Sequence, residues 1–243
     1  MLDPAALTRE KLVATLRDSG KPRRDWLVGA EFERHLLDPE GRPLPYAGLT
    51  GVAALLAAFA ERGWSPIREG AHTIALDGGH ASITLEPGGQ LELSGTAGRT
   101  LGEVEREARQ FAVDVDELAG PDVHQVALGY TPYAAIESIG WVPKGRYAVM
   151  REYLHHTGPL AHHMMKGTCA VQATFDYADE ADCARKVRLA TLLGPLTTAI
   201  YANSPWAEGR PTGFMSWRGH IWTRTDPART GFPAAADAFT FEA

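Results

Sequence analysis

The stretch ASITLEPGGQLELSG, residues 81–95, decides how we interpret the fold. Apolar and polar residues alternate on both sides of a PGGQ break, which is typical of two antiparallel strands joined by a tight turn. Glu86 and Glu92 flank this break. The leucines are expected on the opposite face: Leu85, Leu91 and Leu93. The hairpin therefore raises the question of what its two carboxylates bind.

A second strand with carboxylates on one face is predicted within DWLVGAEFERHLL, residues 25–37. Its alternation places Val28, Ala30, Phe32 and Leu36 on one face and Gly29, Glu31, Glu33 and His35 on the other. Side chains two residues apart on a strand leave the same face, so Glu31 and Glu33 project together. If this strand neighbours the hairpin in one sheet, four glutamates converge on one surface.

Two interpretations of the glutamates remain open at this stage. Carboxylates a few ångströms apart raise one another's pKa or recruit a cation, and hard divalent ions prefer oxygen ligands. Magnesium or manganese is then the simplest partner. The alternative is that each glutamate is solvated or pairs with an arginine. Gln172, which alternates with apolar residues in TCAVQATFDY, residues 168–177, either adds an amide oxygen to the site or is an ordinary core or edge glutamine.

Cationic and aromatic residues are concentrated in two segments. PKGRYAVM, residues 143–150, places Lys144 and Arg146 around a glycine at a predicted helix start. SWRGHIWTRTDPARTG, residues 216–231, contains three arginines and two tryptophans: Arg218, Arg224, Arg229, Trp217 and Trp222. Guanidinium groups bind carboxylates or phosphates bidentately, so these segments favour an acidic substrate. The alternative is a set of surface salt bridges around a tryptophan-rich core.

The rest of the pattern predicts helices interleaved with short strands. Helices are expected over residues 4–18, 50–62, 100–120 and 179–201 and after Gly145, and strand-like runs over 65–94 and 123–130. The strands lie close together with hairpin-like links. This order favours an α+β fold, with helices on one side of a largely antiparallel sheet, over a doubly wound parallel sheet.

Composition bounds the class of protein. The 243 residues fit one domain, residues 1–243, and the net charge of −6, from 24 basic and 30 acidic residues, argues against general nucleic-acid or membrane binding. Two cysteines without metal spacing and a start without a leader pattern predict a cytoplasmic protein. HHTGPLAHH, residues 155–163, does not have a known zinc spacing and is interpreted as a solvated helix end.

Five segments in order resemble the glutamate–cysteine ligase family of plants and proteobacteria, from about residue 27 to the C-terminus: GAEFE, ITLEPGGQLELSG, PKGRYAVM, TCAVQATFDY and IYANSPWAEGRPTGFMSWRGHIWTRTDPARTGFP. The resemblance implies a glutamine synthetase-like fold, in which a curved, mainly antiparallel sheet forms a funnel that holds ATP and glutamate, bridged by Mg²⁺. It also implies ATP-dependent joining of the glutamate γ-carboxyl to the amine of cysteine through a γ-glutamyl phosphate, the first step towards glutathione.

The resemblance also implies roles for individual residues, with ATP and Mg²⁺ as cofactors and L-glutamate, L-cysteine and ATP as the small molecules bound. The implied metal ligands are Glu31, Glu33, Glu86, Glu92 and Gln172. The arginines expected to clamp carboxylates or phosphates during catalysis are Arg146, Arg218 and Arg229. The implied substrate-binding residues are Lys144, Arg146, Tyr147, Asn203, Arg218 and Trp222.

The sequence departs from the family pattern at two positions and in its length. Gly167 stands where plant members carry an arginine, and Arg224 stands where they have an acidic residue. Family members are also nearly twice as long, so the chain corresponds to an N-terminal portion or a short form with an incomplete sheet. These departures leave two alternatives, an inactive glutamate-binding module or a carboxylate–amine ligase with another acceptor. They also predict association through an open sheet edge or with a C-terminal half.

Overall fold

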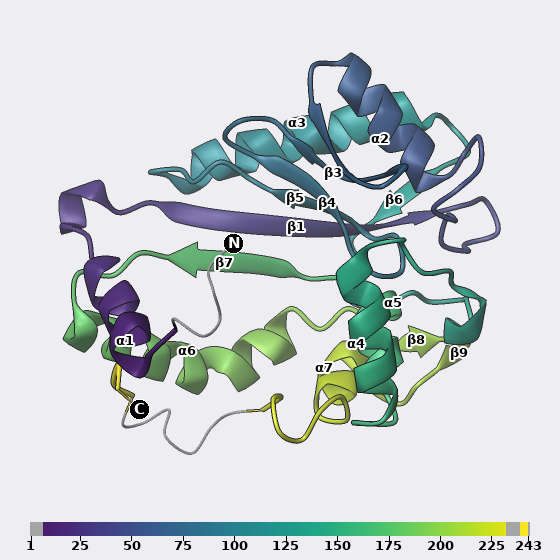
Figure 1. The fold of residues 1–243 in the computed structure, drawn as a ribbon. Helices are drawn as coiled ribbons and strands as arrows, with labels where there is room; N and C mark the ends of the chain where they lie inside the picture. The colour runs from purple at the N-terminus through teal and green to yellow at the C-terminus, as the bar shows by residue number, and fades with distance from the viewer. Residues whose placement is uncertain (1–6, 232–238, 243) are drawn as a thin grey trace.

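The computed structural model describes residues 7–231 and 239–242 as helices arranged around one antiparallel sheet (Figure 1). The helices are α1 (Arg9–Asp18), α2 (Val52–Glu61), α3 (Leu101–Ala119), α4 (Gly145–His155), α5 (Ala161–Gly167), α6 (Glu180–Ile200) and α7 (Trp217–Trp222). Two 3₁₀ turns, η2 (Arg23–Asp25) and η3 (Ile136–Ser138), complete the helical elements described. Within the described ranges, every helix is too short or too polar to cross a bilayer.

The main sheet has seven strands, and each of its pairings is antiparallel. The strands are β1 (Val28–Leu37), β2 (Ser65–Glu69), β3 (His72–Asp77), β4 (Ser82–Leu85), β5 (Leu91–Ser94), β6 (His124–Val126) and β7 (Val171–Phe175). Their order is β2-β3-β4-β5-β1-β6, and β7 also pairs with β1. Two short strands, β8 (Trp206–Ala207) and β9 (Arg210–Pro211), form a separate ribbon. The predicted α+β fold with an open, largely antiparallel sheet is confirmed.

The core lies on the leucine face of the hairpin. Leu85, Leu91 and Leu93 are buried, as the alternation predicts. They pack in one cluster with apolar residues of α2 and α3, which include Leu56, Phe59, Phe111 and Val115. Full burial of one such side chain stabilises the fold by about 1.5–3 kcal/mol. Figure 1 shows α2 and α3 together over this side of the sheet, so the glutamates of the opposite face are turned away from the core.

Local sequence signals explain where the two long helices begin. Thr100 and Glu103 form a capping box at the start of α3, and Gly120 is the C-cap that follows its last residue, Ala119. Asp179 accepts a hydrogen bond from the Asp182 N–H at the start of α6, and α6 continues through Pro195. The alternating pattern of residues 168–177 forms β7, but all five residues of this strand are exposed.

Three expectations differ from the structure. The predicted helix over residues 4–18 begins at Arg9, and its residues 4–6 lie outside the described ranges. The second half of HHTGPLAHH begins the helix α5. The strand predicted over residues 123–130 forms only over His124–Val126, as β6.

Candidate functional site

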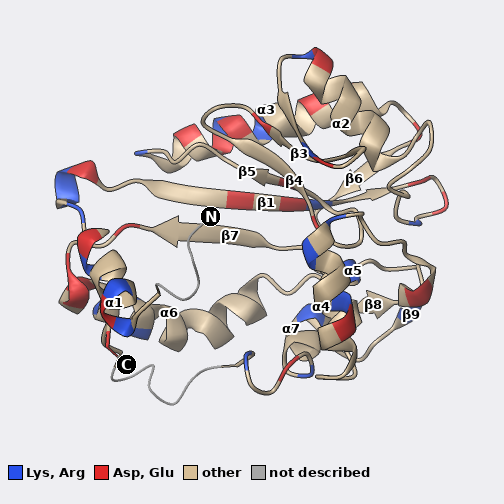
Figure 2. Cartoon of the chain, viewed as in Figure 1, with Lys and Arg blue, Asp and Glu red and all other residues tan. Residues whose placement is uncertain are grey.

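The strand register brings the predicted ligands onto one face of the sheet. Glu33 of β1 lies directly opposite Glu92 of β5, and Glu31 of β1 lies directly opposite Gln172 of β7. Directly opposed residues of antiparallel strands project from the same face, and so do residues two apart on one strand. Four side chains from three strands therefore share one surface, and the acidic residues of β1 form a red band along the middle of that strand in Figure 2.

Glu33 and Glu92 are held by hydrogen bonds from neighbouring strands. The Ala170 N–H donates to Glu33 Oε2 at 2.7 Å, and Gln172 Nε2 donates to Glu33 Oε1 at 3.3 Å. The hydroxyls of Thr84 and Ser94 both donate to Glu92 Oε1 at 3.0 Å. These two hydroxyls were not among the predicted site residues, although Thr84 and Ser94 lie on the same face of the hairpin as Glu92, at even spacing along the strands.

Glu86 sits at the turn of the hairpin, which is anchored to α5. The buried Gln90 accepts a hydrogen bond from the Gly88 N–H at 2.9 Å and donates to the carbonyl of Thr168 at 2.9 Å. A Cβ on Gly88 would lie 2.3 Å from the Lys166 carbonyl oxygen, so the close approach of turn and helix requires glycine. This anchoring fixes the backbone that carries Glu86.

Burial and mutual repulsion raise the pKa of the clustered glutamates. Desolvation, followed by the charges of Glu86 and Glu92, raises the pKa of Glu33 to about 7. Desolvation and the charge of Glu92 also raise the pKa values of Glu31 and Glu86. These repulsions show that the carboxylates act on one another through space, so the cluster favours a proton or a cation.

Residues of the PKGRY segment, 143–147, also contact the hairpin turn. Lys144 Nζ and the Tyr147 hydroxyl both donate to the carbonyl of Leu85 at 2.7 Å, and Lys144 is buried. Desolvation lowers the pKa of Lys144. Arg146 lies 3.8 Å from Glu86 Oε1 and keeps most of its side chain exposed. The structure thus uses Lys144 and Tyr147 to position Glu86 and leaves Arg146 open to an anionic ligand.

Arg218 reaches the cluster from α7. It lies near Glu33 and Cys169, and desolvation lowers its pKa. Its Nε is buried and has no hydrogen-bond partner among the described residues. The guanidinium carbon lies 5.9 Å from the centre of the Trp222 ring. A half-buried guanidinium with an unused donor is suited to a carboxylate or phosphate, as predicted for Arg218.

Two predicted substrate-binding or catalytic residues have other partners in this structure. Asn203 accepts from the Gly129 N–H and donates to the Ala127 carbonyl, both at 2.9 Å, so its amide holds that loop. Arg229 pairs with Asp226 at 2.6 Å and donates to the Tyr153 hydroxyl near the end of α4. Arg146 lies at the opposite end of that helix. The structure therefore brings Arg146 and Arg218 to the carboxylates but not Arg229, and the predicted roles of Arg229 and Asn203 stay predictions.

The donor set fits a hard divalent cation by its chemistry. The set comprises four carboxylates and one amide, and the pKa values of Glu31, Glu33 and Glu86 are raised by desolvation and by neighbouring carboxylates. Among the described residues, no three Asp, Glu, His or Cys side chains are grouped as a ready metal site. The individual ligand assignments therefore stay predictions.

The comparisons with known proteins agree with the geometry. The family model "Glutamate-cysteine ligase family 2" matches residues 27–243. The chain belongs to this glutamate–cysteine ligase family. It is 41% identical to the chloroplastic glutamate–cysteine ligases of Brassica juncea and Arabidopsis thaliana over 244 residues, which is 97% of this chain and 46% of each relative. It is 40% identical to glutamate–cysteine ligase A of Oryza sativa subsp. japonica, of which it covers 48%.

The chain thus spans about half the length of the curated glutamate–cysteine ligases it matches. All five predicted metal ligands fall within the matched residues. At Gly167, a Cβ would lie 2.4 Å from the Tyr130 ring, so no larger side chain fits while Tyr130 holds this position. Arg224, the other departure from the plant pattern, is exposed.

Proposed function

We propose that the chain carries the cation- and glutamate-binding part of an ATP-dependent ligase that joins the glutamate γ-carboxyl to the amine of cysteine. The observation that carries this proposal is the register of β1, which sets Glu33 against Glu92 and Glu31 against Gln172 on one face. Family membership supports the reaction class. In the proposed reaction ATP phosphorylates the γ-carboxylate, and the amine then displaces phosphate from the acyl phosphate.

The proposed roles of the residues follow from their surroundings. Arg146 is exposed beside Glu86 and donates to the Tyr147 hydroxyl at 3.0 Å, and in this proposal its side chain turns from there towards an anionic substrate. Arg218 offers its unused Nε donor from a half-buried position, where a charge-assisted hydrogen bond is stronger than in water. Holding the glutamate carboxylates between fixed cations orients the γ-carboxylate for reaction. Lys144 and Tyr147 keep the turn in place and act as positioning residues.

Glu31, Glu33, Glu86, Glu92 and Gln172 would hold Mg²⁺ in this proposal. When bound, Mg²⁺ offsets the charge of the transferring phosphoryl group and polarises its oxygens. Without a cation, the carboxylates repel anionic substrates. Binding of ATP therefore depends on the ion in this proposal. The cytoplasmic location stays a prediction.

The test is an assay of ADP release by the purified chain with ATP, Mg²⁺, L-glutamate and L-cysteine. We expect ADP release to require both amino acids and to fall at least a hundredfold in Glu92→Gln. Glu61→Gln, an exposed glutamate of α2 outside the predicted site, serves as the matched control. If this chain gives no turnover, the assay is repeated with the C-terminal half of a plant relative added; no recovery, together with no calorimetric binding of glutamate, would contradict the proposal.

A second candidate is a carboxylate–amine ligase with another acceptor. The packing of Tyr130 against Gly167 favours it, because no side chain extends from position 167, where the resemblance places an arginine. A screen of acceptor amines separates the two candidates. Turnover with cysteine at a rate at least equal to that with every other amine would exclude the second.

The exposed apolar residues of α6 and β7 support a proposed partner surface. On α6, Leu189, Leu192, Leu196 and Ile200 are more than half exposed, and on β7, Val171 and Phe175 are. Exposed apolar surface of this extent is typical of an interface. Since the relatives are about twice as long, we propose that the remaining part of the family's domain covers these residues.

A further inference from the structure

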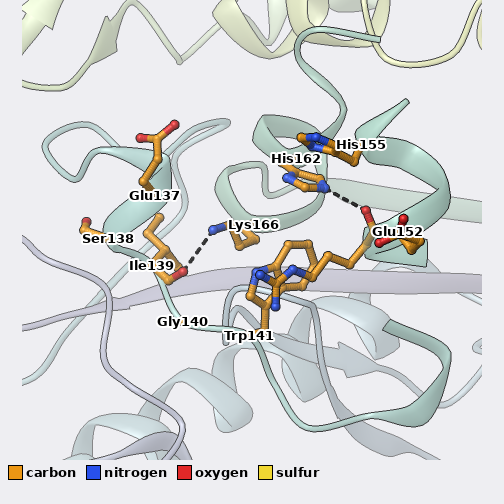
Figure 3. A pocket seen from close by; sticks show the side chains of 10 residues that line it. Glu137, Ser138, Ile139, Gly140, Trp141, Glu152, His155, His162 and Lys166 are labelled. Atoms are coloured by element: carbon orange, nitrogen blue, oxygen red, sulfur yellow. Dashed lines mark hydrogen bonds between the residues drawn. The ribbon is translucent and has the colours of Figure 1, made fainter. Parts of the chain in front are cut away.

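A cavity lies outside the carboxylate cluster, between η3, the loop after it, α4 and α5 (Figure 3). Its volume is about 600 Å³, within the range of roughly 300–1,000 Å³ typical of small-molecule sites. None of its lining residues belongs to the predicted metal or substrate set. The side chains that carry its chemistry are Glu137, Trp141, Arg151, His155, His162 and Lys166.

Two cations line this cavity without a counter-ion. Lys166 is buried, and its Nζ donates to the carbonyls of Ile136 at 2.6 Å and Ile139 at 3.0 Å, which leaves one N–H unused. The Arg151 guanidinium lies 5.4 Å from the Trp141 ring centre, and Lys166 Nζ lies 5.0 Å from it. Among the described residues, no carboxylate oxygen lies within 4 Å of either cation. Both cations line the same cavity.

Glu137 supplies the opposite charge across the cavity. Figure 3 shows it on the far side from His155 and His162, with Lys166 between. Glu137 is exposed and forms no ion pair with the described residues, although its charge acts on Lys166 through space. The other lining glutamate, Glu152, already lies 3.5 Å from His156 Nε2. Glu137 on one side and the two cations, Arg151 and Lys166, on the other line the same cavity without forming ion pairs with one another. This arrangement suits a ligand that carries both a positive and a negative charge.

An adjoining cavity of about 310 Å³ offers room for an uncharged side chain. It shares Glu137, His155, His162 and Lys166 with the first cavity. Its own walls include the apolar residues Ile136, Leu154 and Pro159. The charged groups thus lie beside a recess of mixed polar and apolar lining that has these three apolar residues on its walls.

We propose that this cavity binds a neutral α-amino acid. Its carboxylate lies against Arg151 and the unused Lys166 N–H, its ammonium group lies against Glu137, and its side chain enters the recess beside Leu154. Both charged ends of the ligand then replace bonds to water with charge-assisted hydrogen bonds. The site is independent of the proposed ligase reaction, because it uses no residue of the carboxylate cluster.

The test is calorimetric titration of the full chain with L-alanine, L-valine, L-leucine, L-methionine and L-phenylalanine. We expect at least one to bind, and its N-acetyl and amide derivatives to bind at least tenfold more weakly, since each derivative loses one charge. Glu137→Gln and Arg151→Gln should each weaken binding by about tenfold or more. Both residues are exposed, so neither variant is expected to unfold.

Matched control variants test whether the ligand occupies this cavity. Glu152→Gln, at the same cavity, and Arg106→Gln, an exposed arginine of α3, should leave binding within about twofold of the wild-type chain. Glu33→Gln should also leave binding unchanged, because the ligand does not touch the carboxylate cluster. The proposal is overturned if no amino acid of the set binds, if the N-acetyl derivative binds as tightly as its parent, or if Glu137→Gln and Arg151→Gln are without effect.

Discussion

At the scale of single residues, Glu33 is the centre of the candidate site. Its carboxylate accepts hydrogen bonds from the next strand and lies opposite Glu92, and burial is the main reason that its pKa rises to about 7. The sequence predicted that Glu31 and Glu33 share a face. It could not predict the extent of burial, because that depends on Ala170 and Arg218, which are far away in the chain.

The raised pKa of Glu33 predicts a pH-dependent stability. Folding raises this pKa from 4.5 to about 7, so the folded chain holds the proton more tightly than the unfolded chain. The stabilisation is complete below pH 4.5 and is lost as the pH rises through 7. Glu33→Gln has no such loss. Relative to the wild-type chain, its free energy of unfolding should therefore be about 3 kcal/mol higher at pH 8 than at pH 4.

Urea denaturation at pH 4, 6 and 8 without divalent cations measures this difference. Glu61→Gln, an exposed glutamate of α2, is the control and should show no pH-dependent gain. A constant difference between Glu33→Gln and the wild-type chain from pH 4 to pH 8 would contradict the account of Glu33.

At the scale of elements, the hairpin of β4 and β5 is the best-predicted part. Alternation and the PGG turn predicted both strands and the leucine face, because these signals are local. The sequence did not reveal α5, because HHTGPLAHH has a Gly-Pro break and little apolar periodicity. The sequence also did not reveal the cavity beside η3. Its residues, including Glu137, Arg151 and Lys166, come from three elements that only the fold brings together.

The anchoring of the hairpin turn to α5 predicts opposite effects for two glycine substitutions. Gly88→Ala sets a Cβ 2.3 Å from the Lys166 carbonyl, so backbone must move and stability should fall by about 2 kcal/mol or more. Gly102→Ala in α3 meets nothing within 4 Å and should raise stability by about 0.4–1 kcal/mol. Thermal unfolding of both variants checks the pair, and equal stabilities would argue against a close contact between turn and helix.

At the scale of the whole molecule, the sheet is open, and α6 and β7 present apolar side chains to solvent. The sequence predicted the open edge from the length of the chain relative to its family. It could not predict which face is left uncovered, because the alternation in β7 looks the same for a covered and an exposed strand. These exposed apolar residues of α6 and β7 are therefore the place where we expect association.

If the chain associates through these residues, adding charge to α6 should make it monomeric. Leu192 and Leu196 lie one turn apart and are both more than half exposed, so Leu192→Lys with Leu196→Lys removes apolar surface without opening a cavity. Sedimentation should show concentration-dependent association of the wild-type chain and a smaller or absent effect in the double variant. A wild-type chain that is monodisperse and monomeric at high concentration would count against this expectation.

The central claim is that glutamates from β1 and the hairpin bind a divalent cation together. The most direct measurement is titration of the chain with Mn²⁺, following free Mn²⁺ by electron paramagnetic resonance at pH 8, where Glu33 is ionised. We predict saturable binding that Mg²⁺ displaces and that is lost in Glu33→Gln with Glu92→Gln, while Glu61→Gln binds normally. Absence of saturable binding by the wild-type chain, or binding that survives in the double variant, would contradict the claim.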